Sequence, residues 1–168
     1  MSTPRTRRLF DTDPNVLSLG PWIDPTLEQY GFAVDGEYVE TFWLGTLGPT
    51  ATWLLRRLVH ALRTSNATSD VGATIRLDTR ELAAALGIGS PNGHVMPLAK
   101  ALERLLMFGV AQIRGHKLVV RCFLPPLAAR QIDRLPPHLA RSHSDWVSGR
   151  TDPALPLAPT INRDRSAA

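Results

Sequence analysis

The sequence predicts an α+β protein that is mainly α-helical. Apolar residues recur at helical spacing over residues 49–64 and again over 97–108, and short runs with a strand pattern lie at 73–77 and 110–123. The chain has 168 residues, of which 43% are hydrophobic, which is enough for one core of ordinary size. A wholly disordered chain is therefore not expected.

Composition also limits the class of protein. The single cysteine, Cys122, cannot form an internal disulfide, which argues against a disulfide-stapled secreted scaffold. No apolar run reaches membrane-spanning length, and the basic opening residues 1–8 are followed by acidic residues instead of an apolar stretch. We therefore expect a soluble cytoplasmic protein with no membrane partner.

Charge is distributed unevenly along the chain. Residues 1–48 carry 3 basic and 7 acidic side chains, whereas residues 49–122 carry 10 basic and 4 acidic ones, a net charge of −4 against +6. The remaining residues, 123–168, carry 6 basic and 4 acidic side chains. A basic middle segment indicates a polyanionic partner.

The N-terminal part of the chain is expected to support the centre. Residues 1–13 are expected to be a disordered arm, and residues 14–48 a packing extension that prolines and glycines interrupt. A short helix over 37–46 would bury Tyr38, Phe42 and Trp43. Core packing is expected for all four tryptophans, Trp22, Trp43, Trp53 and Trp146.

The central domain, residues 49–123, is expected to begin with a helix. Gly48-Pro49 is a helix start, and the first helix should run to about Thr64, burying Leu54, Leu58, Ala61 and Leu62. A short strand follows at 73–77.

A second helix is predicted over 78–87. Asp78 and Glu81 have capping-box spacing, Gly87 is suited to end the helix in a left-handed conformation, and its inner face would be Leu82, Ala85 and Leu86.

The third helix and a hairpin complete the central domain. After a polar loop, Pro97 begins a helix to Phe108 with an inner face of Leu98, Ala101, Leu102 and Leu105. Residues 110–114 and 117–123 are expected to be strands joined by a type II′ turn at Gly115-His116. Residues 124–148 are expected to form a C-terminal helical extension, and residues 149–168 a disordered tail.

The order helix, strand, helix, helix and two-stranded wing resembles the winged helix-turn-helix family over residues 49–123. The stretch from Leu77 to Ile88, a capped helix closed by Leu-Gly, is similar to the first helix of a helix-turn-helix pair, and the flanks look similar to little-characterised DNA-binding members from high-GC bacteria. The fold is then a winged helix-turn-helix with helical N- and C-terminal extensions. The resemblance implies that the recognition helix, about 97–108, enters the major groove. It also implies that the wing, about 110–123, contacts the backbone or the minor groove.

Polar and basic residues of these elements are the candidate DNA contacts. The loop before the recognition helix offers hydrogen-bond donors, the helix offers two cations one turn apart, and the wing tip is basic. The candidates are Arg80, Ser90, Asn92, His94, Lys100, Arg104, Arg114, His116 and Lys117.

Catalysis is not expected. The run Ser142-His143-Ser144-Asp145 contains triad residue types, but neighbours within one helical turn do not converge as a catalytic geometry requires. The histidines lack metal-ligand spacing, and no phosphate-binding glycine loop occurs. We expect no enzyme activity, no cofactor, no metal and no small-molecule effector.

The leading hypothesis is a sequence-specific double-stranded DNA-binding protein, a transcriptional regulator that associates with the nucleoid when bound. A homodimer is one assembly that we consider for it. A replication initiator of a plasmid or mobile element belongs to the same class. The alternative from another class is a winged-helix adaptor that binds protein without DNA contact. An adaptor has no need of the net +6 within residues 49–122.

Overall fold

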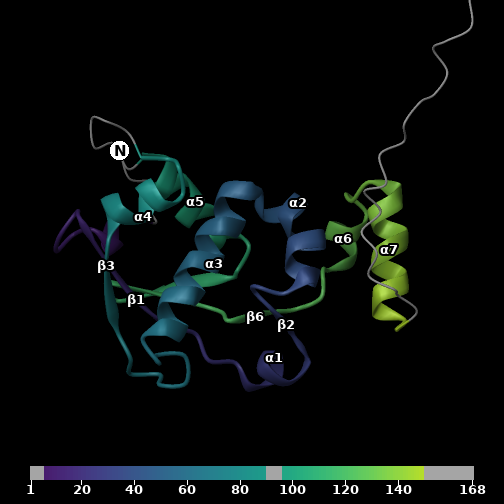
Figure 1. Ribbon diagram of the computed structural model, residues 1–168, viewed down its shortest axis with the longest axis horizontal. Helices are drawn as coiled ribbons and strands as arrows, with labels where there is room; N and C mark the ends of the chain where they lie inside the picture. The colour runs from purple at the N-terminus through teal and green to yellow at the C-terminus, as the bar shows by residue number, and fades with distance from the viewer. Residues whose placement is uncertain (1–5, 90–95, 150–168) are drawn as a thin grey trace, which may run out of the picture. The chain divides into compact units, whose positions relative to one another are not determined.

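The computed structural model describes residues 6–89 and 96–149, which form an α+β structure with a small mixed sheet (Figure 1). The chain divides into two compact units, residues 1–126 and 127–168. Each unit is described by itself below.

The first unit contains both sheets and most of the helices. Its elements, in chain order, are η1 (Arg7–Leu9), β1 (Val16–Pro21), α1 (Pro25–Tyr30), β2 (Phe32–Ala33), η2 (Val39–Trp43), α2 (Leu44–Leu47), α3 (Pro49–Thr64), β3 (Ile75–Asp78), α4 (Thr79–Ala85), α5 (Met96–Met107), β4 (Ala111–Arg114), β5 (Lys117–Val120) and β6 (Phe123–Leu124). The order of helix, strand, two helices and hairpin from α3 to β5 is the order that the sequence predicts.

The larger sheet has the strand order β3-β1-β5-β4, and β2 and β6 form a separate two-stranded sheet. Strand β1 pairs antiparallel with β3 and parallel with β5. We expected the N-terminal segment only to pack around the centre, but it supplies an interior strand. In this strand the fully buried Leu17 and Leu19 alternate with the half-buried Ser18, as period-2 geometry requires.

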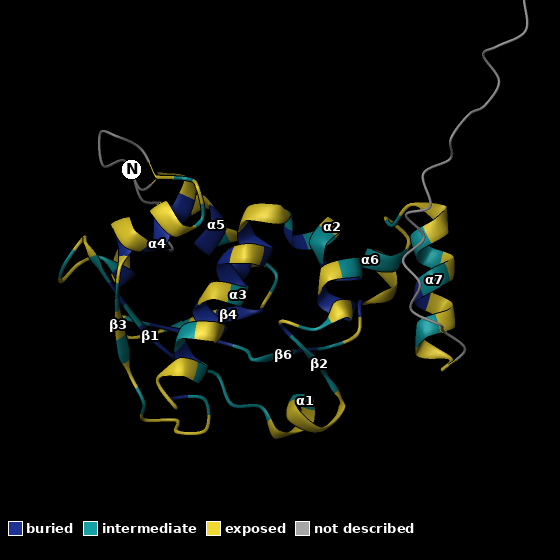
Figure 2. Cartoon of the chain, in the orientation of Figure 1, coloured by how far each residue is buried: buried dark blue, intermediate teal, exposed yellow. Residues whose placement is uncertain are grey.

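The core lies between one face of the larger sheet and the helices. Helix α3 packs against β1 and β5, and α5 packs against α3 and β4. Figure 2 shows the dark buried stripe of α3. The inner face predicted for α5 is confirmed in full, and that of α3 is confirmed except that Ala61 is half-buried. The short helix predicted around 37–46 is confirmed as η2 and α2, with Tyr38, Phe42 and Trp43 buried.

Helix α4 begins and ends as predicted. The side chain of Asp78 accepts hydrogen bonds from the backbone N–H groups of Arg80, at 2.8 Å, and Glu81, at 3.0 Å. At the other end Gly87 has φ +68°. The N–H of Ile88 donates to the carbonyl of Ala83, which completes a Schellman motif.

The hairpin turn is also confirmed, but the second strand is shorter than predicted. Gly115 has φ +63°, which the first central residue of a II′ turn requires. Strand β5 ends at Val120, and β6 pairs with β2 in the other sheet. The chain changes sheets at Arg121 and Cys122, and the carbonyl of Cys122 accepts from the N–H of Val34.

Three further expectations are wrong. A disordered arm is wrong for residues 6–9, because η1 forms there and Thr6 and Leu9 are buried. Trp53 is 54% exposed on α3 and does not belong to the core. Ala85 is exposed, because the buried face of α4 is formed by Thr79, Leu82 and Ala83.

The second unit consists, in its described part, of two helices. These are α6 (Ala129–Ile132) and α7 (Pro137–Val147), so the helices expected after the Pro125-Pro126 and Pro136-Pro137 breaks are confirmed. His143 is buried, and removal from water lowers the pKa of its imidazole. The tail expected at 149–168 lies outside the described residues beyond Gly149.

Gly20 is required where three segments meet in the larger sheet. A Cβ added to it would lie 2.8 Å from the carbonyl oxygen of Ala73 and 3.1 Å from Cδ of Lys117. The Lys117 side chain uses this space to cross β1, and its Nζ donates to the Ala73 carbonyl at 3.3 Å and to Thr74 Oγ1 at 3.1 Å.

Gly20→Ala should therefore destabilise the fold by about 1–3 kcal/mol, since the clash involves backbone that cannot rotate away. Urea denaturation measures the change. The matched control is Gly45→Ala in α2, where an added Cβ meets nothing within 4 Å and helix propensity favours alanine. Equal stability of Gly20→Ala and the wild type would contradict this packing.

Candidate nucleic-acid interface

The face of the larger sheet opposite the core carries a row of cations. Arg114 of β4 pairs with Lys117 of β5, Lys117 pairs with Ser18 of β1, and Ser18 pairs with Arg76 of β3. Residues that pair across neighbouring strands point to the same side of a sheet. The three cations thus span three strand spacings, about 14 Å, on one face.

The exposure of these side chains differs. Arg76 and Arg114 are exposed, and Arg114 Nε donates to Gln112 Oε1 at 3.4 Å. Lys117 was expected at an outward hairpin tip, but it is half-buried and its ammonium is engaged with Ala73 and Thr74. Its charge contributes to the row, while its donors hold the loop before β3.

The hairpin tip adjoins the N-terminal helix η1. The Nδ1 of His116 donates to the carbonyl oxygen of Arg8 at 3.0 Å, and both side chains are exposed. Since Thr6 and Leu9 anchor η1 in the core, Arg7 and Arg8 are held beside the tip. We name Arg8, Arg76, Arg114, His116 and Lys117 the sheet-row surface.

Arg80 lies just beyond the end of β3. It is exposed in the first turn of α4, and the preceding Thr79 is tied to the start of β1 by a bond from its N–H to the carbonyl of Asn15. The same end of the sheet holds the hairpin tip, because Val16 pairs with Asp78 and Ser18 with Lys117. Arg80 therefore borders the sheet-row surface.

Lys100 and Arg104 of α5 lie elsewhere, in an open groove of about 620 Å³ between α5 and the start of α3. Both side chains are exposed. Arg104 is held by donation from Nη2 to the carbonyl of Thr46, at 2.7 Å, and its Cζ lies 5.3 Å from the ring centroid of Phe108. Glu103 also lines the groove and reduces its positive charge.

The nine predicted contacts thus fall into three sets. Arg80, Arg114, His116 and Lys117 gather at one end of the larger sheet, and Lys100 and Arg104 share the α5 groove. Ser90, Asn92 and His94 lie outside the described residues.

Sequence reasoning missed Arg76 and Arg8. The alternation of polar and apolar residues over 73–77 indicates that Arg76 lies on a polar face of its strand. Only the pairing with β1 shows that this face continues to the hairpin. Arg8 carried no signal, because its segment has the composition of a disordered arm.

Two ion pairs in the first unit lower the pKa of carboxyl groups. The Arg121 guanidinium hydrogen-bonds Asp24 and lowers the pKa of its carboxyl, and Arg63 does the same for Asp35. Arg121 also lies over the ring of Trp22, with Cζ 3.7 Å from the ring centroid. Burial raises the pKa of the Cys122 thiol, which favours the unreactive protonated form.

Among the described residues, no three His, Cys, Asp or Glu side chains are grouped to hold a metal ion. The helices in the described ranges are all too short or too polar to cross a bilayer. Comparison of the chain with protein-family models, with curated proteins and with solved structures finds no match.

Acid should weaken the fold through Asp24 and Asp35. Each carboxyl has a lower pKa in the folded than in the unfolded chain, where it is about 3.9. Their contribution is therefore complete above that value and is lost as the pH falls through the folded pKa. We expect the free energy of unfolding to decrease below about pH 4, and to decrease less in an Asp24→Asn/Asp35→Asn variant. Denaturation midpoints across this range test it, and parallel pH profiles for the two proteins would contradict it.

Proposed function

We propose that the protein binds double-stranded DNA in a sequence-specific manner and acts as a transcriptional regulator, with the segment 49–123 serving as a winged helix-turn-helix. The observation that carries the proposal is the alignment of Arg76, Lys117 and Arg114 in one row, continued by Arg8 and His116 at the hairpin tip. Phosphate contacts supply most of the affinity of such proteins for duplex DNA.

The charge of this surface supports a polyanion over an isolated anion. The exposed guanidinium groups of Arg76 and Arg114 come from strands at opposite edges of the sheet. A spacing of about 14 Å between their backbone positions suits separate phosphates of a backbone better than one small ligand.

The second element of the proposal is α5, which we assign as the recognition helix. Lys100 is exposed on its outer face. Arg104 uses one of its five N–H donors for the hydrogen bond to the Thr46 carbonyl, and the others remain available for a base edge. Arg and Lys contact guanine O6 and N7 in the major groove. The sheet-row surface lies on the face of the larger sheet opposite the core, whereas α5 packs on the core side, so the two are assigned as separate contact surfaces and are tested separately.

Removal of the exposed sheet-row arginines should flatten the salt dependence of duplex binding. We expect Arg8→Ala/Arg76→Ala/Arg114→Ala to reduce the slope of log K against log salt by about 2 to 3 units, because each lost phosphate contact removes about 0.9. Affinity should fall similarly for every duplex sequence. Fluorescence anisotropy with a random duplex at several salt concentrations is the measurement.

The matched control is Arg130→Ala/Arg134→Ala/Arg141→Ala, which removes the same charge from exposed positions of the second unit. Circular dichroism should show an intact fold for both triple variants. If the two variants bind duplex DNA equally well, the sheet-row cations serve solubility alone and the adaptor hypothesis is the better one.

Changes in α5 should affect specificity. On a preferred duplex selected from a random library, Lys100→Ala should lose about 1–3 kcal/mol of binding free energy and much less on random DNA. Arg104→Ala should behave in the same way and also lower thermal stability, because the bond to Thr46 is lost. Equal losses on preferred and random duplexes would remove α5 from base recognition.

A further inference from the structure

The outward face of α3 carries a hollow of about 230 Å³ that the sheet-row surface and the α5 groove do not share. Trp53, Arg57 and His60 line it at helical spacing, and Asp35, Arg56 and Arg63 also contribute. Its volume is below the range of about 300–1,000 Å³ typical of drug-sized ligands. An occupant of ordinary ligand size therefore fills the hollow and extends beyond it along the outward face of α3.

Trp53 provides an aromatic platform at this hollow. The side chain is 54% exposed, and the Cζ of Arg56 lies 5.0 Å from its ring centroid. The guanidinium supports the indole on one side, which leaves aromatic surface open to a planar ligand.

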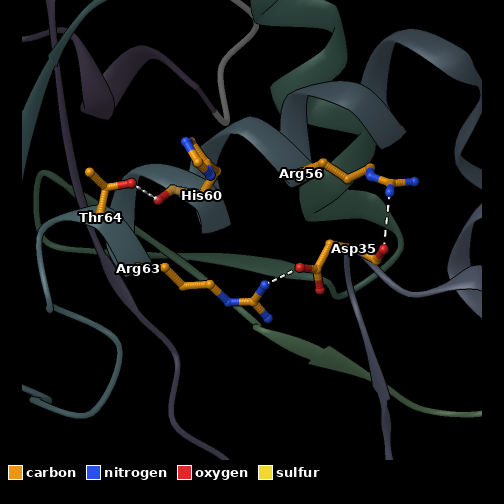
Figure 3. Close-up of polar contacts among 5 residues, drawn as sticks. All are labelled: Asp35, Arg56, His60, Arg63 and Thr64. Carbon is orange, nitrogen blue, oxygen red and sulfur yellow. Dashed lines mark hydrogen bonds and ion pairs between the residues drawn. The ribbon is translucent and has the colours of Figure 1, made fainter.

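The cations of the hollow are not equally available. Arg56 donates to Glu40 Oε2 at 2.8 Å and to the carbonyl of Asp35 at 3.0 Å, and Arg63 pairs with the Asp35 carboxylate. Figure 3 shows Arg56 and Arg63 approaching Asp35 from two turns of α3. Arg57 and His60 are exposed, and the sequence of α3 contains no acidic residue. Arg57 is thus the cation best placed to meet an incoming anion.

Asp35 adds an acceptor at the same place. Its side chain is 51% exposed, and an ionised carboxylate has about four acceptor positions, of which Arg63 occupies part. A carboxylate that keeps acceptor capacity in the same hollow as an aromatic ring suits a flat group with N–H donors on its edge.

We propose that this hollow binds a single nucleotide, with the base stacked on Trp53, the N–H edge of the base donating to the Asp35 carboxylate, and the phosphate held by Arg57 and His60. Guanine fits best, because its N1–H and N2–H₂ donors lie side by side and match a carboxylate. The nucleotide is either free or part of a single strand. This site is independent of the duplex-binding proposal.

An acidic peptide fits the hollow less well. Its carboxylates would approach Asp35, which repels them, and the acceptor positions of Asp35 would then face like charge. A base satisfies the ring, the carboxylate and the cation together.

Titration of the full chain with GMP, followed by calorimetry and tryptophan fluorescence, tests the site. We expect saturable binding of GMP, weaker binding of inosine monophosphate, which lacks the 2-amino donor, and weaker binding of guanosine, which lacks the phosphate. Trp53→Ala should weaken GMP binding by about tenfold or more. Arg57→Ala should weaken GMP by about tenfold but leave guanosine almost unchanged.

Matched controls exist for both variants. Tyr30→Ala removes another exposed aromatic ring, on α1, and Arg130→Ala removes another exposed helical arginine, and neither should change GMP binding. A single-stranded oligonucleotide with one guanine among thymines, compared with GMP, separates a strand-binding site from a site for the free nucleotide. Trp53→Ala should keep its duplex affinity, so failure here and failure of the duplex proposal are distinguishable.

Three results would overturn the proposal. One is the absence of saturation by both GMP and the oligonucleotide, and another is GMP binding by Trp53→Ala equal to that of the wild type. The third is displacement of GMP by a hexaglutamate peptide at equal concentration, which would make the hollow a docking site for acidic peptides.

Discussion

The double pairing of β1 is the constraint on which the first unit depends. Its residues hydrogen-bond to β3 on one side and to β5 on the other, so segments about 40 residues apart join into one sheet only through it. The N–H of Trp22 continues the pairing to the Val120 carbonyl. Arg121, stacked on Trp22 and paired with Asp24, then fixes the exit of the strand. Buried backbone N–H and C=O groups must be paired. Removal of β1 from the sheet would therefore leave unpaired donors and acceptors on both β3 and β5.

Local chemistry explains which parts of this fold the sequence could predict. The caps at Asp78 and Gly87, the II′ turn at Gly115 and the inner face of α5 depend on residues a few positions apart, and all were predictable. Strand β1 was not, because its pairing is long-range and its apolar positions are few before Gly20-Pro21 ends the pattern. The exposure of Trp53 could not be predicted for a related reason. A tryptophan is usually expected to be buried, and only the orientation of α3 on the sheet directs the Trp53 side chain outward.

The candidate interface shows the same division. Residues on a recognisable element, such as Lys100 and Arg114, could be singled out as exposed cations. Their grouping could not, since the register across β1 puts Arg76 in the row with Arg114, whereas Lys100 faces the start of α3. Lys117 shows why sequence position alone is insufficient. It flanks the turn, yet the missing Cβ of Gly20 lets its side chain cross β1 and bond to the loop before β3.

Internal pairing also decides where the positive charge of the middle segment acts. Arg56, Arg63 and Arg121 form ion pairs with Glu40, Asp35 and Asp24, so acidic residues of the N-terminal segment neutralise arginines of the central one. The net charge of +6 over residues 49–122 is thus partly balanced by carboxylates where these segments meet. The exposed arginines for which no such ion pair is described include Arg57, Arg76, Arg80 and Arg114. Of these, Arg76 and Arg114 share one face of the larger sheet, and Arg57 lies one helical turn from the exposed Trp53. A row of cations suits an extended backbone, and a cation beside an aromatic ring suits one planar anion. The two surfaces therefore differ in the shape of ligand they accept, although both attract negative charge.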